Sequence, residues 1–238
     1  PIIRVNEEGK LEVIGKVRGR KKAIQTIIKD LMERIRDGEK TVFISHGDCL
    51  EEAETIKQKL DQIKGRISDP SFLANQGLSN EVGIHVFCYD PKEEMTIQEY
   101  IHWLKKEANP PYRILEYDLY EIFLTLLEEK RILTSIEGIE DRKGSAYLLG
   151  QLQKIATPDA FLKRMEYSPH VRGQDVLFLT GIGKVHPFMR AHRILDSMQH
   201  LFADIPIVMF YPGTFDGQTL SLFGAFEEGH YYRAFNLL

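Results

Sequence analysis

The chain has 238 residues, of which 43% are hydrophobic and 28% are charged, which is the composition of a soluble globular protein. Its 31 basic and 35 acidic residues give a net charge of −4, so direct nucleic-acid binding is not expected. The two cysteines, Cys49 and Cys88, are too few for a disulfide framework or a structural zinc site. No apolar run approaches the ~20 residues that span a bilayer. We therefore expect a cytoplasmic protein with no membrane segment, metal or cofactor.

The first part of the chain predicts a small ββαβ unit. Residues 2–17 alternate weakly between apolar and polar side chains, which indicates a β-hairpin. A basic cluster then leads into a predicted helix over 21–37, and TVFIS at 41–45 is typical of a buried strand. Asp48 is a suitable N-cap for the next helix, which runs to Gly65.

The basic cluster at 18–22 has two interpretations. Its arginines suit a phosphate or carboxylate headgroup, but a loop followed by a solvated helix start explains them equally simply. The segments GKVRGRKKA and TVFISHGDCLEEAE resemble the C-terminal domain of the DegV family of bacterial fatty-acid-binding proteins, over about residues 1–54. This resemblance implies that Arg18 and Arg20 contact a lipid headgroup. The family's N-terminal lipid domain has no counterpart in the sequence.

Strands and helices alternate after Gly65. Residues 71–81 are polar and are expected to form a loop, and the strand VGIHVFCY follows at 82–89. Asp90 then caps a helix that runs to about residue 108. The strand YRILEY at 112–117 is followed by Asp118, which repeats the same strand–aspartate–helix pattern.

Further helices are expected before the next strand. They are placed at 130–140, 143–156 and 158–165. The last clear strand spans 207–211, Pro212-Gly213 forms a turn, and two short edge strands are expected at 218–226 and 231–237.

The stretch from Asp175 to Phe202 organises this part of the chain. A buried strand at 176–179 leads into the turn Gly181-Ile182-Gly183-Lys184, and an amphipathic helix with Pro187 in its first turn is expected to follow. Backbone N–H groups converge where a strand, a glycine turn and a helix start meet, which favours an anion. The turn lacks the full dinucleotide and phosphate-loop patterns, so an ordinary strand–helix turn remains the alternative.

These elements predict an α/β fold with a mostly parallel, Rossmann-like sheet and helices on both faces. Ligands of such sheets gather beyond the carboxyl ends of the strands. The candidate ligand-binding residues at that edge are Asp90, Asp118, Gly181, Gly183, Lys184, His186 and Gly213. Two carboxylates with a histidine and a lysine suit hydrolytic or phosphoryl chemistry, whereas helix capping and turn geometry explain the aspartates and glycines without catalysis. No residue is assigned as catalytic.

A second resemblance covers about residues 55–238. NEVGIHVFCYDPKEE, LEYDLYEIF, VLFLTGIGKVHPFMRAHRILDSMQHLF and PIVMFYPGTFDGQTLSLFG resemble the BrxB family of the bacterial BREX phage-exclusion systems. This resemblance implies a cytosolic α/β protein that works with other BREX components, among them a PglZ-type protein, a large ATPase and a DNA adenine methyltransferase. It carries no established catalytic set. The two resemblances meet near residue 54, and one hypothesis is an engineered or accidental fusion.

Three functions follow as hypotheses. The first is a non-catalytic adaptor of a BREX system that binds other system proteins such as the PglZ-type protein. The second is a nucleotide-binding or phosphoryl-processing enzyme that uses the strand, glycine turn and helix at 176–202. The third is fatty-acid binding through the DegV-like segment. The sequence leaves the oligomeric state open.

Overall fold

The computed structural model describes residues 2–5, 11–15, 50–75, 83–166, 169–198, 201–227 and 234–238. The chain divides into two compact units, residues 1–47 and 48–238. The predicted helix over 21–37, the strand at 41–45, the cap at Asp48 and the headgroup residues Arg18 and Arg20 all lie outside the described residues.

The first unit contains a β-hairpin. Strands β1 (Ile2–Val5) and β2 (Leu11–Gly15) pair antiparallel, with Val5 opposite Leu11. The hairpin predicted from the alternating pattern at 2–17 is therefore confirmed.

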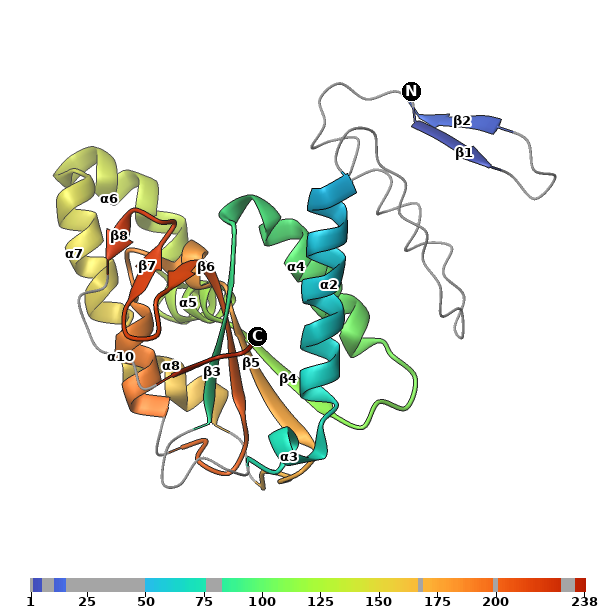
Figure 1. The fold of residues 1–238 in the computed structure, drawn as a ribbon. Coiled ribbons are helices and arrows are strands. Elements are labelled where there is room, and N and C mark those ends of the chain that lie inside the picture. Colours follow the sequence, from blue (N-terminus) through green and yellow to red (C-terminus); the bar gives the residue numbers. More distant parts are fainter. Residues whose placement is uncertain are drawn as a thin grey trace. The chain divides into compact units, whose positions relative to one another are not determined.

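The second unit is built on a parallel sheet (Figure 1). Its strands are β3 (Ile84–Tyr89), β4 (Arg113–Asp118), β5 (Asp175–Thr180), β6 (Ile207–Phe215) and β9 (Phe235–Asn236). Their order across the sheet is β4-β5-β6-β3-β9, and each pair of neighbours is parallel. Two short strands, β7 (Leu220–Leu222) and β8 (Phe226–Glu227), extend antiparallel from the end of β6. The predicted α/β fold with a mostly parallel sheet is confirmed.

Helices cover both faces of this sheet. They are α2 (Leu50–Ile67), α3 (Pro70–Leu73), η1 (Pro91–Glu93), α4 (Glu94–Lys105), α5 (Leu119–Glu129), η2 (Leu133–Ser135), α6 (Ile136–Lys143), α7 (Ser145–Ile155), α8 (Pro158–Met165), α9 (Ile182–Val185) and α10 (Ala191–Met198). In Figure 1, α2 and α4 lie on one side of the sheet, and α5, α7, α8 and α10 lie on the other. None of the helices in the described part of the chain combines the length and the apolar character that a membrane crossing requires.

Successive side chains of the central strands point to opposite faces of the sheet and pack into two hydrophobic cores. Phe178 and Phe210 point to the side of α2, α3 and α4, whereas Leu179 and Met209 point to the side of α5 and α7 to α10. All four side chains are at most 1% exposed. Burial on both faces explains why these strands read as continuous apolar runs in the sequence.

Two contacts fix the start of the strands. Asp175 is fully buried at the first position of β5, where its carboxylate accepts hydrogen bonds from Nε and Nη2 of Arg113, each at 2.7 Å, and from the Val171 amide at 2.9 Å. His85 on β3 is 4% exposed, and its ring lies 4.7 Å from that of Phe72 and 5.8 Å from that of Phe235 on β9. Burial, with a smaller contribution from the charge of Arg66, lowers the pKa of His85 to about 4.

The structure corrects the predicted turn at Pro212-Gly213. Both residues continue β6, which runs for nine residues. The strand pairs with β3 as far as Pro212 and then pairs antiparallel with β7 from Gly213. Proline lacks an N–H, so it is tolerated where the strand changes partner. A Cβ at Gly213 would lie 2.1 Å from the Ser221 carbonyl oxygen, so only glycine allows β7 to approach this closely.

The segment after β5 also differs from the prediction. Gly181 adopts a left-handed conformation with φ of 73°, and the short helix α9 starts directly after it. The chain then turns through residues 186–190, and α10 begins only at Ala191, so Pro187 does not lie in the first turn of a long helix. Residues 71–73, expected in a loop, belong to α3 because Asp69 caps that turn and Phe72 and Leu73 are buried.

Candidate functional site

The candidate site lies at the carboxyl ends of the parallel strands. We call this edge the rim and define it by Asp118, the turn 181–186, and the hairpin 213–226. It gathers most of the residues predicted from sequence, but in two separate groups. Asp118, Gly181 and Lys184 form one group, and Gly183 forms another with the hairpin.

Asp118 is the N-cap of α5, as predicted. Its Oδ1 accepts hydrogen bonds from the Tyr120 amide at 2.8 Å and the Glu121 amide at 3.3 Å. Its Oδ2 lies 3.6 Å from Nζ of Lys184. The carboxylate therefore satisfies two amides of its own helix and pairs with the lysine of the glycine turn.

Gly181 is in direct contact with this carboxylate. A Cβ added at Gly181 would lie 2.0 Å from Oδ1 of Asp118, and the residue's φ of 73° disfavours any other amino acid. An aspartate of the protein itself thus occupies the space beside the turn. The Gly181 conformation and the closeness of Asp118 together account for the first glycine without a ligand.

Gly183 brings the turn against the hairpin. A Cβ there would lie 2.9 Å from Cγ of Pro212 and 3.0 Å from the ring of Phe223. The Phe223 amide donates to the Pro212 carbonyl at 2.9 Å, so the start of the β7–β8 turn is tied to the end of the parallel pairing. The glycine turn and the segment that follows β6 therefore pack against each other at the rim.

Two aromatic side chains of this hairpin face solvent. Phe223 is 41% exposed and Phe226 is 52% exposed. The ring of His186 lies 5.4 Å from that of Phe226, so the histidine predicted as a site residue lies beside an aromatic ring. Sequence reasoning assigned neither phenylalanine to a site, because an apolar residue in a strand-rich segment indicates core. Gly224 between them was the available signal of a turn that exposes its neighbours.

Asp90 stands apart from these groups. It follows β3, which two strands separate from β4 and its Asp118, and its Oδ1 accepts from the Lys92 amide at 2.9 Å. Asp90 therefore caps the 3-10 turn η1 that leads into α4, whereas the N-cap of α4 itself is Glu93. The structure does not pair Asp90 with Asp118.

The other carboxylates near the strand ends also have partners in the protein. Glu116 accepts from Nζ of Lys105 at 2.8 Å and from Oγ1 of Thr180 at 3.2 Å. Glu94 accepts from the Tyr89 hydroxyl at 2.5 Å, and burial together with the charge of Glu94 raises the pKa of that tyrosine. Within the described residues, histidine, cysteine, aspartate and glutamate side chains form no group of three that is suited to a metal ion. This arrangement favours a structural network over acid–base chemistry.

Comparison with known proteins identifies the family of the chain that forms this rim. The family model described as "BREX protein BrxB" matches residues 115–237, from β4 through the glycine turn and the hairpin to β9. A "BREX protein BrxB" of Bacillus cereus (strain H3081.97) is 41% identical over 187 residues, which are 77% of this chain and 97% of that protein. The chain belongs to the BrxB family. A second BrxB, from Escherichia coli O9:H4 (strain HS), is 30% identical over 189 residues, or 77% of this chain and 92% of its own length.

The BrxB match covers the rim but not every predicted site residue. Asp118, the glycine turn and the hairpin lie inside residues 115–237, whereas Asp90 lies before them. No solved structure matches the chain.

The amino-terminal resemblance is also found. A model described as "Uncharacterised protein, DegV family COG1307" matches residues 1–86. The "DegV domain-containing protein CPE0026" of Clostridium perfringens (strain 13 / Type A) is 39% identical over 61 residues, which are 25% of this chain and 21% of that protein. The chain thus spans about a fifth of the length of this DegV relative. The model match extends past residue 54, the boundary predicted from the sequence.

Proposed function

We propose that this protein is a non-catalytic adaptor of a bacterial BREX phage-defence system, and that its rim docks another protein of that system. Membership of the BrxB family supports the assignment to BREX. The observation that carries the adaptor role is the pair of exposed phenylalanines, Phe223 and Phe226, on a hairpin that packs against the glycine turn.

Exposed aromatic rings on a fixed framework are well suited to protein recognition. Aromatic side chains bury a large apolar area at low entropic cost, and they are enriched among the residues that dominate binding energy. The close contact of Gly183 with Phe223 and Pro212 holds the hairpin in place before a partner arrives. Asp118 of the rim is paired with Lys184, and the nearby Glu116 and Glu94 are engaged with Lys105 and Tyr89, which leaves docking better supported than catalysis.

The first partner to test is a PglZ-type protein of a BREX system, in the cytoplasm where we expect both proteins to act. Purified PglZ-type protein is immobilised, and binding of the full chain is measured for the wild type, Phe223→Ala and Phe226→Ala. We expect each substitution to weaken binding about tenfold or more, as for residues that dominate an interface. The control is Val171→Ala, an exposed apolar residue that precedes β5 at the other end of the sheet. Equal binding by all four proteins would contradict the proposal.

The nucleotide hypothesis is discriminated by a separate measurement. Its support is the position of Lys184 and the glycine turn at the end of β5. A thermal-shift panel of nucleotides with divalent cations should raise Tm if the turn binds phosphate, and Gly183→Val should abolish the rise. The adaptor proposal expects no shift across the panel. Fatty acid that co-purifies with the chain and is lost on Arg18→Ala would instead support lipid binding through the first unit.

A further inference from the structure

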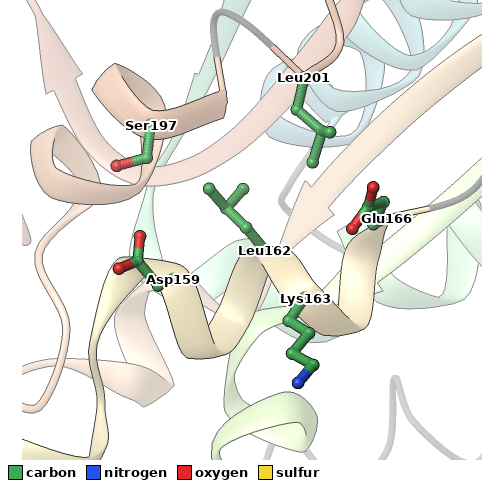
Figure 2. A pocket seen from close by; sticks show the side chains of 6 residues that line it. All are labelled: Asp159, Leu162, Lys163, Glu166, Ser197 and Leu201. Atoms are coloured by element: carbon green, nitrogen blue, oxygen red, sulfur yellow. The ribbon is translucent and has the colours of Figure 1, made fainter.

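A groove between α8 and α10 forms a second surface outside the rim. It has a volume of about 380 Å³ and is lined by Asp159, Leu162, Lys163, Glu166, Ser197 and Leu201. Figure 2 shows Leu162 of α8 and Leu201 facing each other across it. Both leucines are half-buried and pack against the core beneath α8 and α10, so the floor of the groove is apolar and anchored.

Two carboxylates flank this apolar floor. Asp159 and Glu166 lie at the two ends of the α8 edge, and both are exposed. The amine of Lys163 points away from Leu201 in Figure 2. Within the described part of the chain, neither carboxylate forms an ion pair or a side-chain hydrogen bond, in contrast to Asp118 and Glu116, which pair with Lys184 and Lys105. The groove therefore offers two unpaired negative charges on either side of an aliphatic floor.

We propose that this groove docks a helix of a separate protein that carries two basic residues seven positions apart with aliphatic residues between them. Asp159 and Glu166 are themselves seven residues apart, which is two helical turns or about 10.5 Å. Lysine or arginine at positions i and i+7 of an adjacent helix matches this spacing. Aliphatic residues at i+3 and i+4 of that helix lie on the same face and reach Leu162 and Leu201.

A second copy of this chain is a poorer occupant. Of the described helices, α2 carries basic residues seven positions apart in two pairs, Lys57 with Lys64 and Lys59 with Arg66. Nζ of Lys64 is already bound to Glu107 at 2.6 Å, and Leu60 packs against the core of its own unit. Arg66 lies 4.0 Å from Asp69 and over the ring of Phe72. Charge complementarity therefore favours a different protein with a basic amphipathic helix.

The test uses the full chain and two designed peptides. Each is a fluorescein-labelled, 18-residue amphipathic helix with leucines between two charged residues seven apart, and these are lysines in one peptide and glutamates in the other. Fluorescence anisotropy measures both affinities at low and high salt. We expect the lysine peptide to bind at least tenfold more tightly than the glutamate peptide, and to lose most of this preference at high salt.

Charge reversal tests the location. Asp159→Lys with Glu166→Lys should reverse the preference between the two peptides. The matched control is Glu121→Lys with Glu128→Lys, an exposed pair with the same spacing on α5, which should leave the preference unchanged. Leu162→Asp should weaken binding of the lysine peptide at least tenfold. If that variant unfolds, the two charge-reversal pairs still decide the location.

Three outcomes would overturn the proposal. One is equal affinity for the two peptides, and another is the same response from the α8 and α5 charge-reversal pairs. The third is a concentration-dependent dimer in sedimentation that Leu162→Asp abolishes, which would assign the groove to a second copy. A negative result here leaves the rim proposal standing, because the two surfaces share no residue.

Discussion

Replacing Gly181 with alanine tests whether the glycine turn is closed by the protein's own carboxylate. The substitution places a methyl group 2.0 Å from Oδ1 of Asp118, in a residue whose φ is 73°. The carboxylate must then move, and the two amides at the start of α5 lose their acceptor. We therefore expect destabilisation from the strained backbone, from the lost helix cap and, to a small extent, from the weakened contact with Lys184.

The expected magnitude is the sum of these sources. Holding alanine in the left-handed region costs about 1–2 kcal/mol. Loss of an aspartate N-cap costs about 1 kcal/mol. The contact between Lys184 and Asp118, at 3.6 Å and partly exposed, adds at most a few tenths of a kcal/mol. The free energy of unfolding should fall by about 2–3 kcal/mol in total.

Gly173 supplies the matched control. Its φ is 80°, but a Cβ there meets nothing within 4 Å, so Gly173→Ala measures the backbone cost alone. Urea unfolding is followed by fluorescence of Trp103, the single tryptophan, which lies on α4 and reports on the second unit. Gly181→Ala should cost about 1 kcal/mol more than Gly173→Ala, and this excess should vanish when both proteins also carry Asp118→Ala. An equal loss of unfolding free energy for the two glycine substitutions would refute the conclusion that the Asp118 carboxylate fills the space beside Gly181.

Three further predictions concern buried or half-buried groups. Burial holds the pKa of His85 at about 4 in the folded protein, below the ordinary histidine value of 6.5. The unfolded chain therefore binds the proton first as the pH falls, so the stability from this residue is complete above pH 6.5 and is lost toward pH 4. Because of this residue, the free energy of unfolding measured in urea should be about 2 kcal/mol lower at pH 5 than at pH 7.5. His85→Phe should remove this part of the pH dependence, and an unchanged difference in the variant would contradict the prediction. Asp175→Asn should destabilise the second unit by about 2–3 kcal/mol, because it leaves the bidentate hydrogen bonds of Arg113 imperfectly matched, and a loss under 0.5 kcal/mol would show that the pair is dispensable. Burial raises the pKa of Cys88 to about 12, so in a Cys49→Ser background its thiol should react with a disulfide reagent at pH 8 more than 100-fold slower than free cysteine, and reaction at the free rate would show the site to be open.

Sequence patterns predicted correctly those features that depend on neighbouring residues alone, such as helix caps and buried strands. An aspartate after an apolar run caps a helix whatever lies elsewhere, and both Asp90 and Asp118 do so. Continuous apolar strands also identified the parallel sheet, because only strands covered on both faces need them.

Sequence patterns gave wrong predictions where the structure depends on contacts with residues far away in the sequence. Pro212-Gly213 is a strong turn dipeptide, but β7 pairs with the chain from Gly213 onward, so β6 continues through the dipeptide. Pro187 suits a helix start, but the helical turn α9 already begins after Gly181. The exposure of Phe223 and Phe226 is likewise decided by where the hairpin packs, which no local pattern contains.

The glycines of the rim have one common explanation. Gly181, Gly183 and Gly213 each stand where a Cβ would meet another element within 3 Å: the Asp118 carboxylate, the Pro212 ring, and the Ser221 carbonyl oxygen. In a phosphate-binding turn, glycines serve to bring backbone amides close to the ligand. Here the same residue type brings three protein segments close to one another. These contacts account for the glycine pattern without requiring a nucleotide. In the docking role that we propose, a hairpin whose aromatic residues are already held in position would lower the entropic cost of binding a partner.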